Sequence, residues 1–274
     1  MEHLSLFFSH LTVYLLFIHG LDFEFLFDET IPQVKYMSYI KSLISSERSL
    51  WDSVVQHPLI TDMCDDTLPI ERFRDYMVQL RFVTGDGLRN LLCRLLADCQ
   101  PEHSISASIV GHIQSLQPGG DHFEAITEML KATGHPEKTL WAEPLPATEA
   151  LCDLLYKIGV TGSVHEKLIA ICTLVEITDA RFEHARKHEK TPTNPVFAMW
   201  CSHHAASLIH PKLQWLHAAI DATMSGPSHS IEPRDSQLFK RIVQWVLLMN
   251  DNVRERGRFE FPLTHYYHKK EVLL

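Results

Sequence analysis

WDSVVQHPLITDMCDDTLPIERFRDYMVQL, residues 51–80, is the stretch of the chain that decides the fold. Its apolar residues, among them Phe73 and Met77, recur every three or four positions, which is the period of one face of an α-helix. Pro58 and the polar residues after it predict a break between two helices. Thr67 offers a capping oxygen for the second helix, and a proline two residues later fits its first turn.

The same helical period extends in both directions from this stretch. Proline or glycine lies in almost every gap between the periodic segments, and no segment alternates with period two for long enough to predict a sheet. The sequence therefore predicts an all-α, multi-helix bundle with one core. The further helical segments are 36–55, 88–96, 104–116, 122–132, 148–158, 163–188, 194–209, 212–224 and 235–256.

Gly85-Asp86-Gly87 interrupts the helix that begins after Thr67. Each glycine inside a helix costs roughly 1 kcal/mol relative to alanine, so the pair needs a reason. The helix either kinks there or is approached closely by another part of the chain. We expect the kink, which is the simpler of the two.

Composition and charge narrow the class of protein. The chain has 274 residues, of which 45% are hydrophobic and 22% charged, and its mass is 31.5 kDa. These values exclude a disordered chain and allow a large core. A formal charge of −9 argues against a nucleic-acid partner. Six scattered cysteines without a CxxC pair predict reduced thiols in a cytoplasmic protein.

The N-terminus carries an uncharged, apolar run over residues 4–18. Its flanks do not fit a secretory signal, because an acidic residue precedes it and acidic residues follow it. We favour an accessory extension over a signal or a membrane anchor, and Met37 is an alternative start of the protein. The expected organisation is an extension over residues 1–35, a helical domain over 36–256 and a tail over 257–274.

The opening stretch also resembles a known family. The residues that carry the resemblance are Trp51, His57-Pro58-Leu59, Asp65–Phe73, Tyr76 and Gln79, with weaker matches at His112, Gly162, Pro195–Phe197 and Trp200. This pattern is similar to the TenA (thiaminase-II)/PqqC-like family. The resemblance implies a heme-oxygenase-like helical fold, a homo-oligomer, and a small-molecule ligand: the family hydrolyses aminopyrimidine breakdown products of thiamin.

The family's catalytic groups are missing from the matching positions. The acidic residue that follows the glutamine of the opening helix corresponds to Leu80, and the nucleophilic cysteine corresponds to Leu174. Cys172 is two residues earlier, about 200° away around a helix, and Asp86 is six residues after Leu80, so neither is expected to face the same way. Cys172 and Asp86 are therefore only weak catalytic candidates.

We expect the chain to bind a small planar ligand, such as a thiamin-derived aminopyrimidine, with hydrolase chemistry altered or lost. The alternatives are a metal-dependent or cofactorless oxidase of the same fold, and a non-catalytic oligomeric scaffold. By the resemblance, the ligand-binding positions are Tyr76, Leu80, Phe82, Val83, Leu151, Leu174, Thr178, Trp200, His204 and Asn250.

A di-iron site is the metal alternative, because some proteins of this fold hold two iron atoms. Its best constellation pairs Asp179 and Glu183 with His217 and Asp221, each pair four residues apart on a predicted helix. We expect these side chains not to converge, since such pairs are common on helix surfaces, and we expect no cofactor. The neighbouring run that contains Arg181, His184, Arg186 and His188 is interpreted as a solvated helix end.

Overall fold

The computed structural model describes residues 38–99, 105–134, 142–188, 190, 192–203, 210–224 and 231–255. These residues form helices and no strand, so the predicted all-α class is confirmed. They lie within one compact unit, Met37–Leu274. The predicted N-terminal extension, the alternative start at Met37 and the C-terminal tail lie outside the described residues.

The first helices differ from the prediction around Pro58. They are α2 (Tyr39–Ser46), α3 (Arg48–Val55), α4 (Pro58–Cys64), α5 (Ile70–Phe82) and α6 (Arg89–Asp98). Pro58 begins α4 rather than ending a helix, because the first helical position needs no N–H. His57 caps this helix, and its Nδ1 accepts the Leu59 N–H at 3.1 Å. The Thr67 hydroxyl bonds to the carbonyl of Asp62 and does not cap α5.

A π-helix, η2 (Val83–Leu88), joins α5 to α6 and contains both glycines of the interruption. A Cβ atom on Gly87 would lie 2.8 Å from Leu155 Cδ1, whereas a Cβ atom on Gly85 would meet nothing within 4 Å. We expected a kink alone to explain the two glycines. The structure shows in addition that Leu155 approaches the backbone closely at Gly87. Insertions of this kind are frequent at functional sites.

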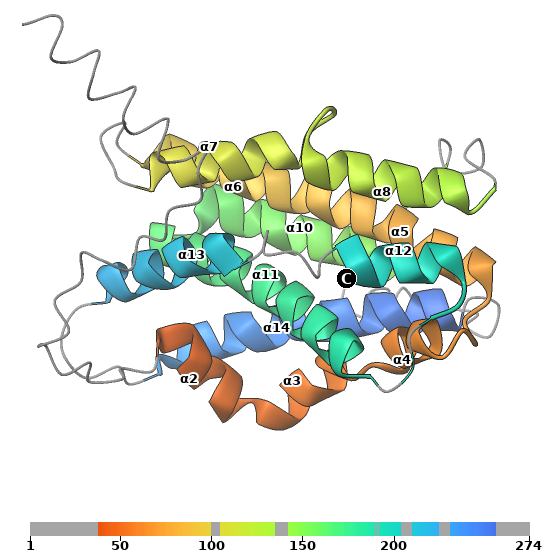
Figure 1. The fold of residues 1–274 in the computed structure, drawn as a ribbon. Helices are drawn as coiled ribbons and strands as arrows, with labels where there is room; N and C mark the ends of the chain where they lie inside the picture. The colour runs from red at the N-terminus through yellow and green to blue at the C-terminus, as the bar shows by residue number, and fades with distance from the viewer. Residues whose placement is uncertain are drawn as a thin grey trace, which may run out of the picture. The chain divides into compact units, whose positions relative to one another are not determined.

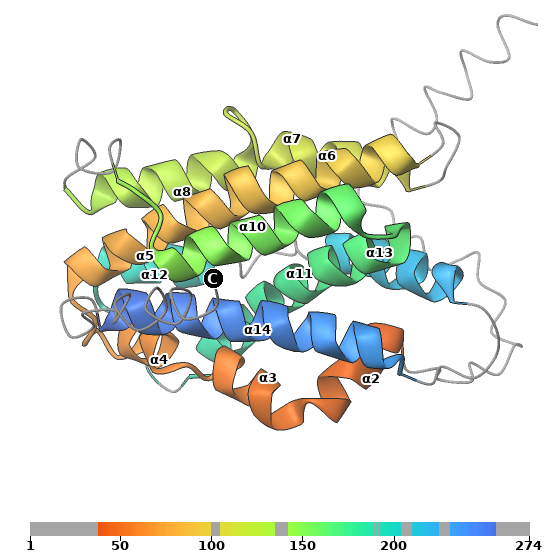
Figure 2. The same cartoon turned by 180° about the vertical axis from the view of Figure 1, so that it is seen from behind.

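The later helices include one long central helix, α11. They are α7 (Ser106–Ser115), α8 (Asp121–Ala132), α10 (Pro146–Thr161), α11 (Val164–Lys187), α12 (Pro195–His203), α13 (His210–Thr223) and α14 (Pro233–Arg254). Helix α11 contacts α3, α6, α10, α13 and α14, and Figures 1 and 2 show it between α10 and α14. Its N-terminus is fixed by a capping box between Ser163 and Glu166.

Aromatic side chains from three helices meet beside α11. The ring of Trp200 on α12 lies 4.4 Å from that of Phe182 on α11 and 6.4 Å from that of Tyr76 on α5. Trp200 is among the largest fully buried side chains. This contact sets the distance between α5, α11 and α12, where the candidate site lies. None of the described helices is long and apolar enough to span a bilayer.

Candidate functional site

A cavity of about 100 Å³ lies where α5, η2, α11, α12 and α14 meet, next to α7 and α8. Its wall is mostly apolar. Residues 174, 178 and 181 of α11 reach it because they repeat at helical spacing on one face. The predicted ligand-binding residues that line it are Tyr76, Leu80, Val83, Leu174, Thr178 and Trp200.

The other predicted ligand-binding residues lie elsewhere. Leu151 is fully buried in the core and does not line the cavity. Phe82 also lies outside the lining, with the Arg81 guanidinium 5.6 Å above its ring centre. Asn250 is fully buried next to a lining residue, and neither atom of its side-chain amide has a hydrogen-bond partner. His204 lies outside the described residues.

The two positions that the family resemblance assigns to catalysis both face the cavity, and both are leucines. Leu80 and Leu174 belong to the lining, whereas Cys172 is fully buried and Asp86 is exposed outside it. Burial also raises the pKa of the Cys172 thiol well above its usual value, which suppresses the nucleophilic thiolate. Within the described part of the chain, no cysteine lines the cavity.

Arg181 is the lining residue that the sequence interpretation placed wrongly. It was assigned to a solvated helix end, yet its side chain is buried and lines the cavity. Its Nε donates to the carbonyl oxygen of Val54 at 3.0 Å, and its Nη2 has no hydrogen-bond partner. Burial lowers the pKa of the guanidinium, and a hydrogen-bonding interaction with Tyr76 opposes that shift. The three- and seven-residue spacing from Thr178 and Leu174 is the signal that identifies it.

A separate cluster brings together Cys172, Glu176 and His217, whose ligand atoms all lie within 4.8 Å of one another. His217 is the member that the di-iron hypothesis includes. Both carboxylate oxygens of Glu176 already have a partner within the protein: one contacts Lys41 Nζ at 2.9 Å and the other contacts His217 Nε2 at 2.6 Å. Burial raises the pKa of Glu176, but these hydrogen bonds outweigh it and leave the pKa lowered.

This cluster does not fit a di-iron centre. Such a centre takes several carboxylates from facing helices, and the cluster has one. Among the described residues, Asp179 and Glu183 do not join any convergent group of three ligands. Asp221 instead accepts the backbone N–H of Tyr39 at 3.1 Å, where a carboxylate stabilises the first turn of α2.

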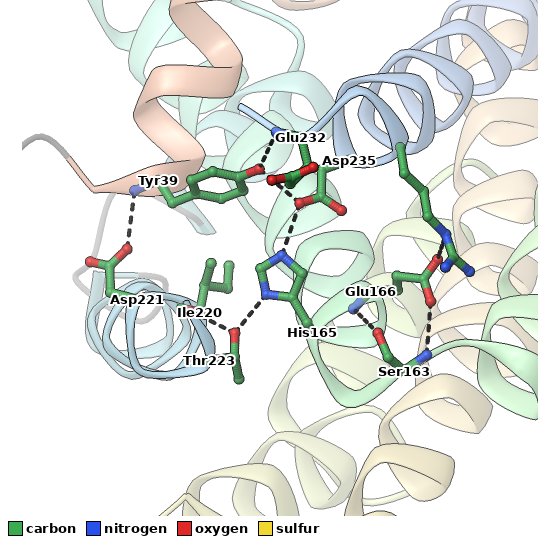
Figure 3. A network of polar contacts seen from close by, with 10 residues as sticks. Tyr39, Ser163, His165, Glu166, Ile220, Asp221, Thr223, Glu232 and Asp235 are labelled. Atoms are coloured by element: carbon green, nitrogen blue, oxygen red, sulfur yellow. Dashed lines mark hydrogen bonds and ion pairs between the residues drawn. The ribbon is translucent and has the colours of Figure 1, made fainter. Parts of the chain in front are cut away.

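Figure 3 shows a second polar network, which joins α2, α11, α13 and α14. The Tyr39 hydroxyl donates to Asp235 Oδ2 at 2.7 Å and accepts the backbone N–H of Glu232 at 3.1 Å. His165 bridges Asp235 at 2.9 Å and the Thr223 hydroxyl at 2.6 Å. The Thr223 hydroxyl lies 2.7 Å from the carbonyl oxygen of Ile220, to which it donates. The network holds the ends of these four helices together. None of its residues lines the cavity, so we assign it a structural role.

Ionisation of this network is shifted by its surroundings. The pKa of Tyr39 is raised from 10.0 to about 12, mainly by burial and in part by the hydrogen bond to Asp235. For Asp235, burial raises the pKa, but hydrogen bonds from His165 and Tyr39 lower it below its usual value. Both shifts favour the hydrogen bond in which neutral tyrosine donates to carboxylate.

Solved structures of other proteins share this fold. A TenA homologue from P. horikoshii OT3 has a TM-score of 0.69 at 17% identity, over 81% of this chain and 100% of that chain. A TenA homologue from Pseudomonas syringae pv. tomato has a TM-score of 0.64 at 16% identity, over 83% and 98%. A domain of unknown function with a heme oxygenase-like fold, from Shewanella denitrificans OS217, has a TM-score of 0.56 at 16% identity, over 82% and 94%. The predicted heme-oxygenase-like fold is confirmed.

Similarity in sequence identifies the family. No curated protein matches the chain significantly. The sequence model of the TENA/THI-4/PQQC family, however, matches residues 44–245, which is well over half of the chain. This match includes the opening stretch and most of the helices that enclose the cavity. The chain therefore belongs to the TENA/THI-4/PQQC family.

Proposed function

We propose that the cavity binds a small planar ligand, such as a thiamin-derived aminopyrimidine, and that the hydrolase chemistry of thiaminase-II relatives is altered or lost. The observation that carries the proposal is that Leu80 and Leu174 both line the cavity. These are the positions where the resemblance expects the carboxylate and the nucleophilic thiol. The proposed binding requires no metal or cofactor.

Leucine can perform neither task. It cannot transfer a proton, so the contribution of a positioned acid or base, about 10²–10⁴-fold in rate, is absent. It cannot attack carbon, so no covalent intermediate forms at position 174. The nearest thiol along α11, that of Cys172, is buried outside the lining.

The wall of the cavity supports a planar ligand, and its volume limits that ligand to a single ring. An apolar protein cavity of about 150 Å³ holds a benzene ring, so in a cavity of about 100 Å³ a ring ligand requires the wall to move outward. Aromatic side chains of Tyr76, Phe182 and Trp200 contribute to the wall. Such side chains pack well against a flat heterocycle.

Calorimetric titration with 4-amino-5-hydroxymethyl-2-methylpyrimidine tests the binding proposal. We expect saturable binding to the full chain and its loss in Thr178→Phe, because the larger side chain fills the cavity. Thr67→Phe is the matched control, since Thr67 is exposed and lies outside the lining. Binding that survives Thr178→Phe unchanged would place the ligand elsewhere, and no binding to the wild type would contradict the proposal.

We also propose that the chain forms a homo-oligomer, as the family resemblance implies. Tyr156 and Val160 support this, because both are large, more than half exposed and one turn apart on α10. Light scattering after size exclusion is expected to give a multiple of 31.5 kDa. A mass of one chain at every concentration would contradict it.

A further inference from the structure

We propose that the cavity selects a ligand that carries a carboxylate, which pairs with the guanidinium of Arg181 and leaves an acceptor for the indole N–H of Trp200. This inference rests on the proposed binding function and specifies the chemical class of its ligand. It is carried by two buried donors without acceptors that belong to one cavity wall.

Arg181 brings into this wall a positive charge that has no carboxylate partner among the described residues, although it interacts with Tyr76. Its side chain is only 4% exposed, and it forms no ion pair with any carboxylate of the described residues. Asp121 is the acidic residue of the lining, but it is exposed, and its Oδ1 accepts the backbone N–H of His122 at 2.9 Å. Burial of an unpaired charge is costly, so proteins keep such groups where a partner binds.

A structural role accounts for only part of the hydrogen-bonding capacity of the Arg181 guanidinium. Its Nε donates to the carbonyl of Val54 at 3.0 Å, and Val54 is the penultimate residue of α3. The carbonyl end of a helix carries about half a negative charge, which offsets Arg181 partially. Nη2 takes no part in this contact and has no other acceptor. The side chain therefore fixes α3 with one nitrogen and offers another to a ligand.

Trp200 provides the second donor. It is 1% exposed, its ring packs against Phe182 and Tyr76, and its Nε1 has no hydrogen-bond partner. A buried indole N–H normally finds an acceptor. The cavity wall therefore has two hydrogen-bond donors without acceptors and one positive charge. A negatively charged ligand with several acceptor atoms would satisfy both.

Carboxylate fits these donors better than phosphate does. A carboxylate is planar and matches the fork of a guanidinium. Phosphate is a larger, tetrahedral anion with more oxygens, and each buried oxygen needs a hydrogen-bond donor. The cavity is small and its wall mostly apolar, so the additional oxygens would remain unpaired.

An isosteric pair of probes tests the inference on the unmodified full chain. The probes are 4-aminopyrimidine-5-carboxylate and 4-aminopyrimidine-5-carboxamide, titrated separately in a calorimeter at pH 7.5. We expect the carboxylate to bind roughly 10- to 100-fold more tightly, which is the range for a hydrogen-bonded charged pair. Inorganic phosphate, titrated in parallel, is expected to bind at least tenfold more weakly than the carboxylate.

Two substitutions assign the preference to the two donors. Arg181→Gln removes the charge and is expected to abolish the preference for carboxylate. Trp200→Phe keeps an aromatic ring and is expected to weaken binding of the carboxylate several-fold. Arg48→Gln is the control for net charge, because Arg48 is exposed on α3 and pairs with Asp52. Circular dichroism and thermal melts identify any variant that fails to fold.

The outcomes separate this inference from the proposed function. Equal or tighter binding of the carboxamide by the wild type would overturn the carboxylate inference and leave planar-ligand binding intact. A folded Arg181→Gln that keeps the preference would also overturn it. If neither probe nor the hydroxymethyl pyrimidine binds, both proposals fail. If phosphate binds as tightly as the carboxylate, the site is a general anion site and the class proposed here is wrong.

Discussion

Helical spacing along α11 decides which side chains reach the cavity. Leu174, Thr178 and Arg181 share the face that lines it, whereas Cys172 lies about 200° from Leu174 and faces the cluster with Glu176. A shift of two positions therefore separates a thiol from the site completely. The same helix thus presents an apolar wall and one cation on one side, and a balanced polar cluster on another.

Tyr39 gives a prediction for alkaline stability at the residue scale. Its pKa is about 12 in the folded chain and about 10 in the unfolded chain. A folded pKa above the unfolded one stabilises the protein fully below pH 10, and this contribution is lost as the pH rises towards 12. We expect urea unfolding to show this loss in the wild type and a smaller loss in Tyr39→Phe.

Tyr156→Phe is the matched control for that experiment, since it also removes only a hydroxyl group and Tyr156 lies on α10, outside this network. It is expected to keep the wild-type dependence on pH. Tyr39→Phe also loses two hydrogen bonds, so it is expected to be less stable at pH 8 by about 1–2 kcal/mol. An alkaline profile identical in Tyr39→Phe and the wild type would contradict the account of this network.

Individual residues of the candidate site could be predicted from the sequence only at positions that the family resemblance covers. Leu80, Leu174 and Trp200 were predicted because the family resemblance reaches those positions, and all three line the cavity. Arg181 was missed, because a run of charged neighbours indicated solvent and outweighed its spacing from Thr178. Which polar group becomes buried depends on tertiary packing, here on α3 and α12, and a local pattern does not contain it.

At the scale of elements, the π-helix η2 shapes one side of the cavity. Val83, Thr84 and Leu88 belong to both the π-helix and the lining. The wider turn accommodates the close approach of α10 at Gly87. The sequence indicated an interruption through its two glycines, but the choice between a kink and a close approach required the position of Leu155 on another helix.

The two glycines give a matched pair of substitutions. In Gly85→Ala the new methyl group meets nothing within 4 Å, so we expect stabilisation by about 0.4–1 kcal/mol. In Gly87→Ala it meets Leu155 Cδ1 at 2.8 Å inside the core, and overpacking costs about 1–3 kcal/mol, which exceeds the gain in helix propensity. Chemical denaturation measures both. Equal stability of the two variants would contradict the packing described at η2.

Pro58 shows the limit of predicting element boundaries. A proline after a helical segment was interpreted as a break, and the first helix does end before it. The proline then begins α4, because His57 supplies the capping acceptor. Helix type was predictable from periodicity across the chain, whereas the start of this helix depended on a side-chain cap that propensity does not reveal.

At the scale of the whole molecule, two buried carboxylates join distant helices. Glu176 connects α2, α11 and α13 through Lys41 and His217, and Asp235 connects α2, α11 and α14 through Tyr39 and His165. Both carboxyl groups have a lowered pKa after burial is outweighed by hydrogen bonds. Their contribution to stability is therefore present above the unfolded pKa, near 4, and is lost as the pH falls through the folded value.

Glu176→Gln tests this linkage. We expect it to lower the free energy of unfolding by about 2 kcal/mol at pH 7, because it removes hydrogen bonds between charged groups, and to flatten the dependence between pH 5 and pH 3. Glu71→Gln, at an exposed position of α5, is the control. An acid profile as steep in Glu176→Gln as in the wild type would show that other groups govern acid unfolding.

The molecule as a whole has the fold of its family, and leucines line its cavity at the two positions that the resemblance assigns to catalysis. A turnover assay tests this central claim most directly, with the aminopyrimidine substrate of thiaminase-II relatives and the wild type beside Cys172→Ser and Asp86→Asn. We expect background hydrolysis for all three proteins. Robust turnover by the wild type that either substitution destroys would contradict it and assign the family's reaction to relocated residues.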